Sequence, residues 1–227
     1  MVVSNDSAIG ISGLRAAESI ANEMLHSRSL SVPKQRFTAD AESLRALCSH
    51  NVFQYTHSGD LTLGHQTLFD VFVISSALRQ GITLNDFISR LPQVPFVRPS
   101  IRSFVMHLAS GRKSTLRRQI RSVLVGDSAF HIRRLVVETF SGLHPEDEDW
   151  PLVRDLRNNY KDMFQAIYTH ASSPEWHFFF LKHLVPILIE KHDADGLMTH
   201  VHMVSKWLNI DPRGVVNFWS TALTLTA

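Results

Sequence analysis

The strongest constraint on the fold is a change of pattern at residue 65. Residues 61–64 alternate apolar and polar side chains, which is the period of a β-strand. After Thr67 the apolar residues, among them Phe69 and Phe72, recur every three or four positions, which is the period of an α-helix. His65 lies at the junction. The pattern therefore predicts a histidine side chain held between two rigid elements, where it can be directed at a ligand.

The preceding residues complete a hairpin. Residues 52–55 form a second short apolar–polar run, and the segment His57-Ser-Gly-Asp60 between the two runs is rich in turn-forming residues. Gly59 can adopt a positive φ there. The two runs predict a β-hairpin at residues 52–64, and residues 39–49 have the pattern of a helix. Helix, hairpin and helix is the element order of a winged-helix domain.

The rest of the chain predicts helices without a repeat of fixed period. Further helices are expected at about 11–27, 67–79, 83–92, 99–111, 116–126, 129–141, 146–170 and 174–189, and from Asp195 and Asp211 onward. We predict a mainly α protein in two parts. Residues 1–80 form a winged-helix domain with one β-hairpin, and residues 81–227 form an irregular α-helical array, the start of an α-solenoid-like region.

Composition narrows the protein class. An apolar content of 44% with 19% charged residues is ordinary for a soluble, core-forming chain. A net charge of +2 is too small to indicate nucleic-acid binding by itself. The single cysteine, Cys48, allows no internal disulfide, and the N-terminus lacks the pattern of a signal peptide. The most apolar stretch, residues 178–189, is too short to span a bilayer. We therefore expect a cytoplasmic protein without a membrane partner.

A resemblance adds to this interpretation. The run Leu-Thr-Leu-Gly-His-Gln-Thr-Leu-Phe-Asp at residues 61–70 resembles the winged-helix region of bacterial STAND-class signalling ATPases, which are relatives of the NACHT proteins of innate immunity. Segments 13–25, 94–102 and 130–142 resemble the helix that enters that domain, the linker that follows it and a later helix. The resemblance covers roughly residues 8–150. It implies a regulatory and sensor module in signal transduction, with a role in antiviral defence.

The catalytic motif of such an ATPase is missing. A P-loop requires G-x-x-x-x-G-K-[ST], so that a glycine backbone wraps the phosphates and a lysine reaches them. Ser110-Gly-Arg-Lys-Ser114 lacks the first glycine and the strand that should lead into it. We therefore expect no hydrolysis and no cofactor bound by this chain alone. The resemblance implies that ADP or ATP is shared with a P-loop ATPase domain, in the same protein or a neighbouring chain, and that the trigger is an unidentified protein.

The resemblance also assigns a role to His65. In NACHT-type relatives the matching histidine contacts the β-phosphate of bound ADP and closes the inactive form. A hydrogen bond to a charged phosphate contributes about 1.5–3 kcal/mol, enough to shift a two-state equilibrium by one or two decades. The alternative is a histidine that caps the helix or fills a polar gap.

A basic stretch is the second candidate site. Its members, a set of possible anion or partner contacts, are Arg112, Lys113, Arg117, Arg118 and Arg121. Arg133 and Arg134 follow on the next predicted helix. Such a cluster can meet phosphates or an acidic partner. A solvated face opposite the apolar stripe at residues 116–124 is the favoured alternative.

The winged-helix pattern also raises a DNA-binding function. A winged-helix transcription regulator with a helical ligand-binding or dimerisation domain would need an exposed, basic recognition helix, yet residues 41–49 and their flank offer only Arg45 and His50 as donors. Nucleic acid is therefore not an expected partner.

His200 and His202 are two positions apart on a predicted helix and would point about 200° apart, so no metal site is expected.

Overall fold

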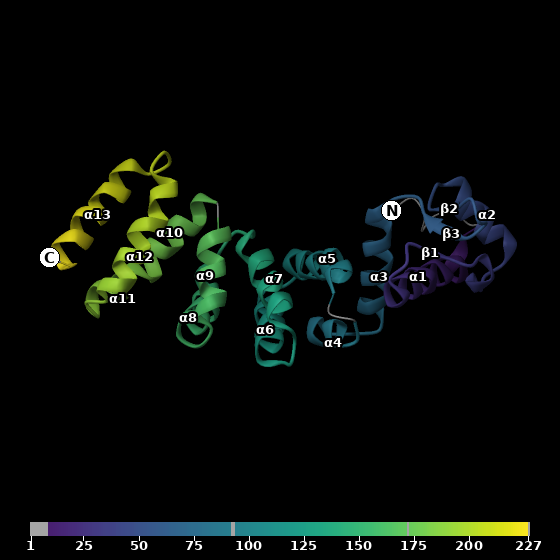
Figure 1. Cartoon of the computed structure of the whole chain (residues 1–227), viewed down its shortest axis with the longest axis horizontal. Helices are drawn as coiled ribbons and strands as arrows, with labels where there is room; N and C mark the ends of the chain where they lie inside the picture. Colours follow the sequence, from purple (N-terminus) through teal and green to yellow (C-terminus); the bar gives the residue numbers. More distant parts are fainter. Residues whose placement is uncertain (1–8, 92–93, 172, 227) are drawn as a thin grey trace. The chain divides into compact units, whose positions relative to one another are not determined.

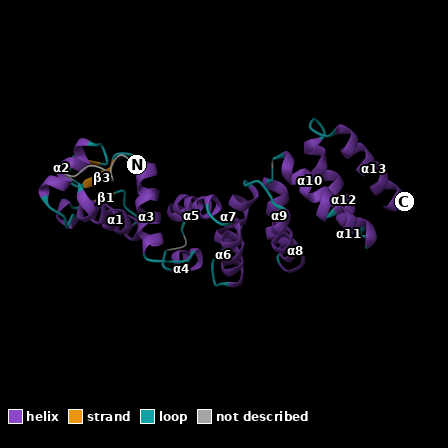
Figure 2. Ribbon diagram, turned by 180° about the vertical axis from the view of Figure 1, so that it is seen from behind, coloured by secondary structure: helices purple, strands orange, loops and turns teal. Residues whose placement is uncertain are grey.

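The computed structural model describes residues 9–91, 94–171 and 173–226. The protein is mainly helical and carries a small antiparallel sheet of three strands (Figures 1 and 2). The chain forms two compact units, residues 1–132 and residues 133–227, which we call the N-terminal unit and the C-terminal unit. The division falls in the first turn of α7 (Phe130–Ser141).

Helix α1 (Gly10–Ser27) is a central element of the N-terminal unit. Its buried residues, including Ile20 and Met24, recur every three or four positions and form one continuous apolar stripe. The helix ends at Arg28, which adopts the left-handed conformation with φ of 56°. The stripe packs against α3 (Gln66–Arg79), so burial of this face holds the unit together.

The sheet lies in the same unit and is drawn in orange in Figure 2. Its strands are β1 (Ser31–Val32), β2 (Phe53–Tyr55) and β3 (Leu61–Leu63), in the order β1-β3-β2. The expected hairpin between β2 and β3 is confirmed, with Thr62 opposite Gln54. Strand β1 was not foreseen, because two residues are too few to show a period of two.

Helix α2 (Ala41–Ser49) follows the short 3-10 helix η2 (Lys34–Arg36). The Asp40 carboxylate caps α2 by accepting a hydrogen bond of 2.7 Å from the Ser43 amide. The Ser43 hydroxyl donates to the carbonyl oxygen of Ile9 at 3.1 Å. This pair of bonds fixes the start of α2 beside the start of α1.

The remaining elements of the N-terminal unit are helical. They are α4 (Leu84–Ser89), η3 (Pro95–Val97), α5 (Arg98–Ser110) and α6 (Lys113–Val125), followed by the start of α7. Thr83 caps α4, as its sequence predicts, by accepting from the Asp86 amide at 3.2 Å. The Leu84 amide donates to Gln119 Oε1 at 2.6 Å, which joins α4 to α6. The compact unit therefore extends beyond residue 80, where the sequence predicts the end of a winged-helix domain.

Aromatic side chains dominate the core of the C-terminal unit. Trp176, Phe180 and Trp207 are almost completely buried there. After α7, the helices are η4 (Asp147–Asp149), α8 (Trp150–Asn159), α9 (Lys161–His170), α10 (Pro174–His183), α11 (Val185–Glu190), α12 (Ala194–Val204), η5 (Ser205–Trp207) and α13 (Pro212–Thr226).

Two helices expected to be continuous are interrupted. The helix expected at 146–170 breaks at Tyr160, whose φ of −138° and ψ of 63° are not helical, and α9 packs back on α8. The helix expected through 178–189 breaks at Leu184, because Pro186 lacks an amide hydrogen and its ring crowds the preceding turn. Asp193, rather than Asp195, caps α12 by accepting from the Gly196 amide at 2.9 Å.

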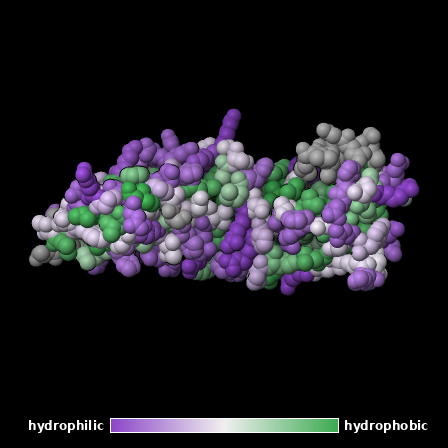
Figure 3. Space-filling model, turned by 90° about the horizontal axis from the view of Figure 1, so that it is seen from above, coloured by the Kyte–Doolittle hydropathy of each residue, from purple (hydrophilic) through white to green (hydrophobic). Residues whose placement is uncertain are grey.

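Exposed apolar side chains are distributed over the surface and are interspersed with polar ones (Figure 3). They include Ile11, Val125, Met198 and Leu223. Within residues 9–91, 94–171 and 173–226, no helix combines the length and the apolar character that a membrane crossing requires.

Candidate functional site

His65 occupies the corner between β3 and α3, as its sequence position predicts. Its backbone is extended, with φ of −148° and ψ of 136°, and its side chain is exposed. The ring also caps α3, because Nδ1 accepts a hydrogen bond of 3.2 Å from the Thr67 amide. The capping role raised as an alternative is therefore present, and it leaves the ring at the surface.

The cap determines which ring nitrogen of His65 can donate. A nitrogen that accepts a hydrogen bond carries no proton, so in the neutral ring the proton resides on Nε2. No described residue forms a hydrogen bond with Nε2. An exposed imidazole in this state offers one N–H donor, on Nε2, to a ligand.

A glycine is required immediately before His65. A Cβ atom on Gly64 would lie 2.1 Å from the backbone oxygen of Asn51, far inside van der Waals contact. The Gly64 amide instead donates to the carbonyl oxygen of Val52 at 2.9 Å. This close approach holds the end of β3 against the residues that precede β2, and it therefore fixes the backbone from which His65 projects.

The start of α3 favours an anion. No acidic residue lies in its first turn, so the positive end of the helix dipole is not neutralised there by a side chain of that turn. The first carboxylate along the helix is Asp70, which is half-buried and accepts a hydrogen bond of 2.7 Å from the Ser100 hydroxyl. Burial raises the pKa of the Asp70 carboxyl, and the hydrogen bond from Ser100 partly offsets this shift.

A cavity begins two residues beyond His65, at Thr67. It lies between α3 and α5, has a volume of about 230 Å³, and its lining includes Thr67, Asp70 and His107. Cavities that enclose small ligands usually measure about 300–1,000 Å³. His65 is not part of the lining. The exposed ring of His65 therefore lies outside this cavity, whose volume is below the usual range for a ligand site.

The basic set from the sequence lies on α6 and at its N-cap. Lys113, Arg117 and Arg121 follow one another at intervals of four residues, so they share one side of the helix. They are partly buried, whereas Arg112 and Arg118 are exposed. Lys113 and Arg117 also have interaction partners within the protein.

The apolar stripe expected on α6 is confirmed, because residues 116, 120, 123 and 124 are buried. The partly buried charges flank this stripe, and the exposed ones are solvated. Arg134, by contrast, belongs to the C-terminal unit, where its Nε donates to Glu138 at 2.7 Å. The seven basic residues are therefore divided between the two units, with Arg133 and Arg134 in the C-terminal unit.

The other candidates have ordinary structural surroundings. Burial raises the pKa of the Cys48 thiol, which disfavours the reactive thiolate. On α2, Arg45 is exposed and its Nε donates to the Ala41 carbonyl at 3.3 Å. His200 is buried with Nδ1 3.2 Å from the Tyr168 hydroxyl, while His202 is exposed. Within the part of the chain that the structure describes, no three His, Cys, Asp or Glu residues form a group that could hold a metal ion.

Sequence reasoning missed a second polar site at the other end of α3. There Glu18 of α1, although surrounded by the apolar stripe of its helix, forms an ion pair with Arg79. An acidic residue inside an apolar helical stripe was the available signal, because a buried carboxylate needs a partner. The partner and the neighbouring groups come from separate helices, which a single sequence does not reveal.

Comparisons with known proteins give no match for this chain among protein-family models, curated proteins or solved structures. The functional argument therefore depends on the geometry and the residues described above.

Proposed function

We propose that this chain is the regulatory and sensor module of a STAND-type NTPase. In this proposal residues 1–80 act as a winged-helix domain, and His65 contacts a phosphate of the nucleotide held by a neighbouring ATPase domain. Residues 81–227 act as a helical array that relays the binding of a protein trigger. The observation that carries the proposal is the exposed ring of His65 at a strand–helix corner, with Nδ1 already engaged in capping α3.

The arrangement supports phosphate contact in three ways. The cap leaves Nε2–H as the outward donor of the neutral ring. The first turn of α3 contains no carboxylate that would repel a phosphate. The close approach at Gly64 restricts the backbone beneath the ring, so little conformational entropy is lost when the contact forms. Together they give a preorganised donor for an anion supplied from outside.

The size of this interaction suits a switch. A hydrogen bond to a charged group contributes about 1.5–3 kcal/mol, which changes an equilibrium constant by roughly 10- to 100-fold. A contact of this size present in only one conformation would favour that conformation by the same factor. It would retain ADP in the closed state without preventing activation by a trigger.

ATP hydrolysis is performed by the partner of this chain. Because the sequence of this chain contains no P-loop motif, ATP hydrolysis belongs to the ATPase domain, in the same protein or in a neighbouring chain. We propose that the assembly works in the cytoplasm in signal transduction and antiviral defence. The location and the role in signalling and defence both derive from the resemblance of residues 61–70 to the winged-helix region of STAND ATPases.

The test is the ADP affinity of an assembly that contains this chain and its ATPase domain, measured by isothermal titration calorimetry. His65→Asn removes the imidazole but keeps a side chain that caps helices well. We expect the dissociation constant for ADP to rise about 10- to 100-fold, with the free energy of unfolding changed by less than about 0.5 kcal/mol. Basal activity of the assembly should rise as the closed state is lost.

His57→Asn is the matched control, because His57 is also exposed and lies in the hairpin turn. It should leave ADP affinity unchanged. An unchanged affinity in His65→Asn, with ADP still bound by the ATPase domain, contradicts the proposed role of His65.

A further inference from the structure

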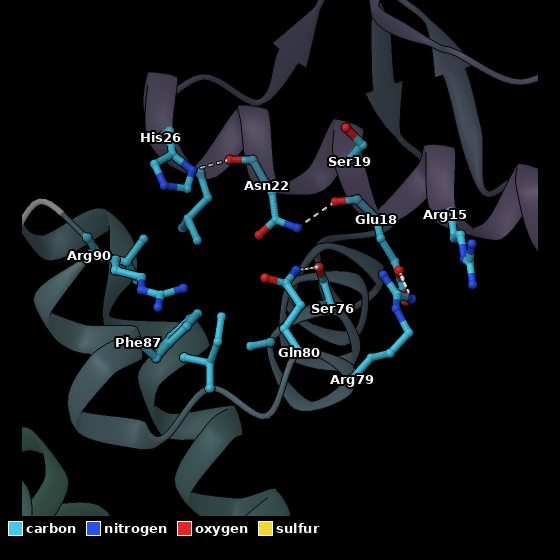
Figure 4. A pocket seen from close by; sticks show the side chains of 14 residues that line it. Arg15, Glu18, Ser19, Asn22, His26, Ser76, Arg79, Gln80, Phe87 and Arg90 are labelled. Atoms are coloured by element: carbon cyan, nitrogen blue, oxygen red, sulfur yellow. Dashed lines mark hydrogen bonds and ion pairs between the residues drawn. The ribbon is translucent and has the colours of Figure 1, made fainter.

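A larger cavity lies in the N-terminal unit at the C-terminal end of α3. It is formed by α1, α3 and α4 and has a volume of about 400 Å³ (Figure 4). This volume is within the usual range of about 300–1,000 Å³ for small-molecule sites. Apolar side chains that include Leu25, Ile82 and Phe87 form part of its lining, and polar groups complete it. A mostly apolar wall with a few placed polar groups is typical of ligand pockets.

The lining of this cavity has more positively than negatively charged side chains. Glu18 is the single carboxylate in the lining, and Arg79 neutralises it through their ion pair. The Glu18 side chain is only 9% exposed, so its charge is committed to this partner. Arg15 and Arg90 also line the cavity, and neither has an ion-pair or hydrogen-bond partner among the described residues. An excess of positive charge therefore remains for a ligand.

Three polar side chains, Arg90, Asn22 and Gln80, direct polar atoms toward the centre of the cavity. Figure 4 shows the guanidinium group of Arg90 directed inward beside the ring of Phe87. Asn22 Nδ2 donates to the Glu18 carbonyl at 2.8 Å, and Gln80 Nε2 donates to the Ser76 hydroxyl at 3.1 Å. These bonds fix the orientation of both amides. Their side-chain oxygens face the open centre of the cavity, where they can accept hydrogen bonds (Figure 4).

We propose that this cavity binds a small organic anion that carries a ring and N–H donors. The anionic group, a carboxylate or a phosphate, pairs with Arg90, whose planar guanidinium suits both. The N–H donors meet the side-chain oxygens of Asn22 and Gln80, and the ring lies against Phe87. The site is separate from His65, because α3 has 14 residues and is therefore about 21 Å long.

Two probes separate the two anion chemistries. 2-Aminobenzoate carries a carboxylate, a ring and an amine, and adenosine monophosphate carries a phosphate with an amine-bearing ring. Each is titrated calorimetrically into the full-length chain, beside benzoate, aniline and inorganic phosphate, each of which lacks part of the proposed chemistry. We expect one of the two probes to bind with a dissociation constant below about 1 mM and about tenfold more tightly than the incomplete compounds. Failure of both probes to bind at millimolar concentration, or binding of the incomplete compounds with equal affinity, overturns the proposal.

Variants then assign the residues. Arg90→Gln removes an exposed charge and should weaken binding of the preferred probe about tenfold or more. Gln80→Met should reduce the preference for 2-aminobenzoate over benzoate, or for adenosine monophosphate over inorganic phosphate, because an acceptor for the amine is lost. Arg102→Gln on α5 is the control, because Arg102 is exposed and is not part of the cavity lining.

Equal probe affinity in Arg90→Gln and in the unchanged chain overturns the proposal. The variant His65→Asn should bind the probe normally. The result for this cavity is therefore independent of the result for the nucleotide contact.

Discussion

The two compact units differ in whether they bury any histidine. Every histidine of the N-terminal unit is exposed: His26, His50, His57, His65, His107 and His131. The C-terminal unit instead buries His177 and His200 completely. An exposed imidazole can meet a ligand, whereas a buried one affects the stability of its own unit. The comparison shows that histidine contributes to the core only in the C-terminal unit, where His177 and His200 are buried while others, such as His202, are exposed.

Burial of His200 has an electrostatic cost. Desolvation, with a smaller contribution from the neighbouring His177, lowers the pKa of His200 to about 3. The Tyr168 hydroxyl lies 3.2 Å from His200 Nδ1, and burial raises the pKa of Tyr168. His177 Nε2 lies 3.2 Å from the Asp211 carboxylate. The neutral form of His200 is therefore built into the folded C-terminal unit.

Acid should destabilise the C-terminal unit most strongly. The unfolded chain protonates His200 near pH 6.5, whereas the folded unit does so only near pH 3. Between these values the unfolded state binds more protons, so the stability present above pH 6.5 is lost as the pH falls toward 3. The expected loss is up to about 1.4 kcal/mol per pH unit. Urea midpoints at several pH values can be followed by tryptophan fluorescence, because all four tryptophans lie in this unit.

His200→Leu removes the titrating group and should reduce this pH slope, although it leaves the Tyr168 hydroxyl without its partner. His107→Leu, at an exposed position of the N-terminal unit, should leave the slope unchanged. If His200→Leu and the unchanged chain lose stability equally on acidification, burial of His200 is not the cause of the acid destabilisation.

A substitution of Gly64, the residue before His65, should cause the next largest loss of stability. Gly64→Ala should destabilise the N-terminal unit by about 3 kcal/mol, because the new Cβ would collide with the Asn51 backbone. Gly111→Ala is the matched control, since its Cβ would have an ordinary contact of 3.5 Å with the Leu108 oxygen. Hydrogen exchange of peptides from α1 and α3 reports the change. Equal protection in the two variants would show that the close approach at Gly64 is not required.

The ion pair between α1 and α3 should contribute less. Arg79→Met leaves the nearly buried Glu18 carboxylate without its partner, and we expect a loss of about 2 kcal/mol in the N-terminal unit. Glu18→Leu combined with Arg79→Met removes both charges and should recover part of this loss. The same exchange experiment measures both variants. A double variant as unstable as the single one would indicate that packing, rather than the unpaired charge, sets the cost.

The smallest effect concerns the cap of α4. Thr83→Ala should cost about 1 kcal/mol, because the Asp86 amide loses its acceptor, while Thr83→Ser should be nearly neutral. Urea unfolding followed by circular dichroism measures both. Variants in the N-terminal unit should leave the tryptophan transition of the C-terminal unit unchanged. A shift of that transition by Thr83→Ala would show that the two units do not unfold separately.

Local signals predicted much of the fold. The position of Thr83 at a helix start, and the hairpin with Gly59 at a φ of 86°, depend on neighbours in sequence and are confirmed. Strand β1 could not be predicted, because it is defined by pairing with β3 about thirty residues later. The break at Tyr160 was also missed, because the apolar spacing continues on both sides and does not show that the chain reverses.

The candidate sites likewise separate into features that local sequence predicts and features that depend on residues distant in the chain. The exposed corner at His65 follows from the change of period at that residue, so its location was accessible from sequence. The need for a glycine at position 64 could not be predicted from the sequence, because it arises from the close approach of the Asn51 backbone oxygen, thirteen residues earlier in the chain. The cavity at Arg90 was missed for a related reason, since its polar groups come from three helices.

The most direct test of the proposed function is the ring ¹⁵N spectrum of His65 in the assembly with the ATPase domain. When ADP is added, the resonance of Nε2 should shift, while Nδ1 should keep the signature of an acceptor bonded to the Thr67 amide. This result would place the outward nitrogen at the phosphate. Ring resonances that are identical with and without bound ADP would contradict the account.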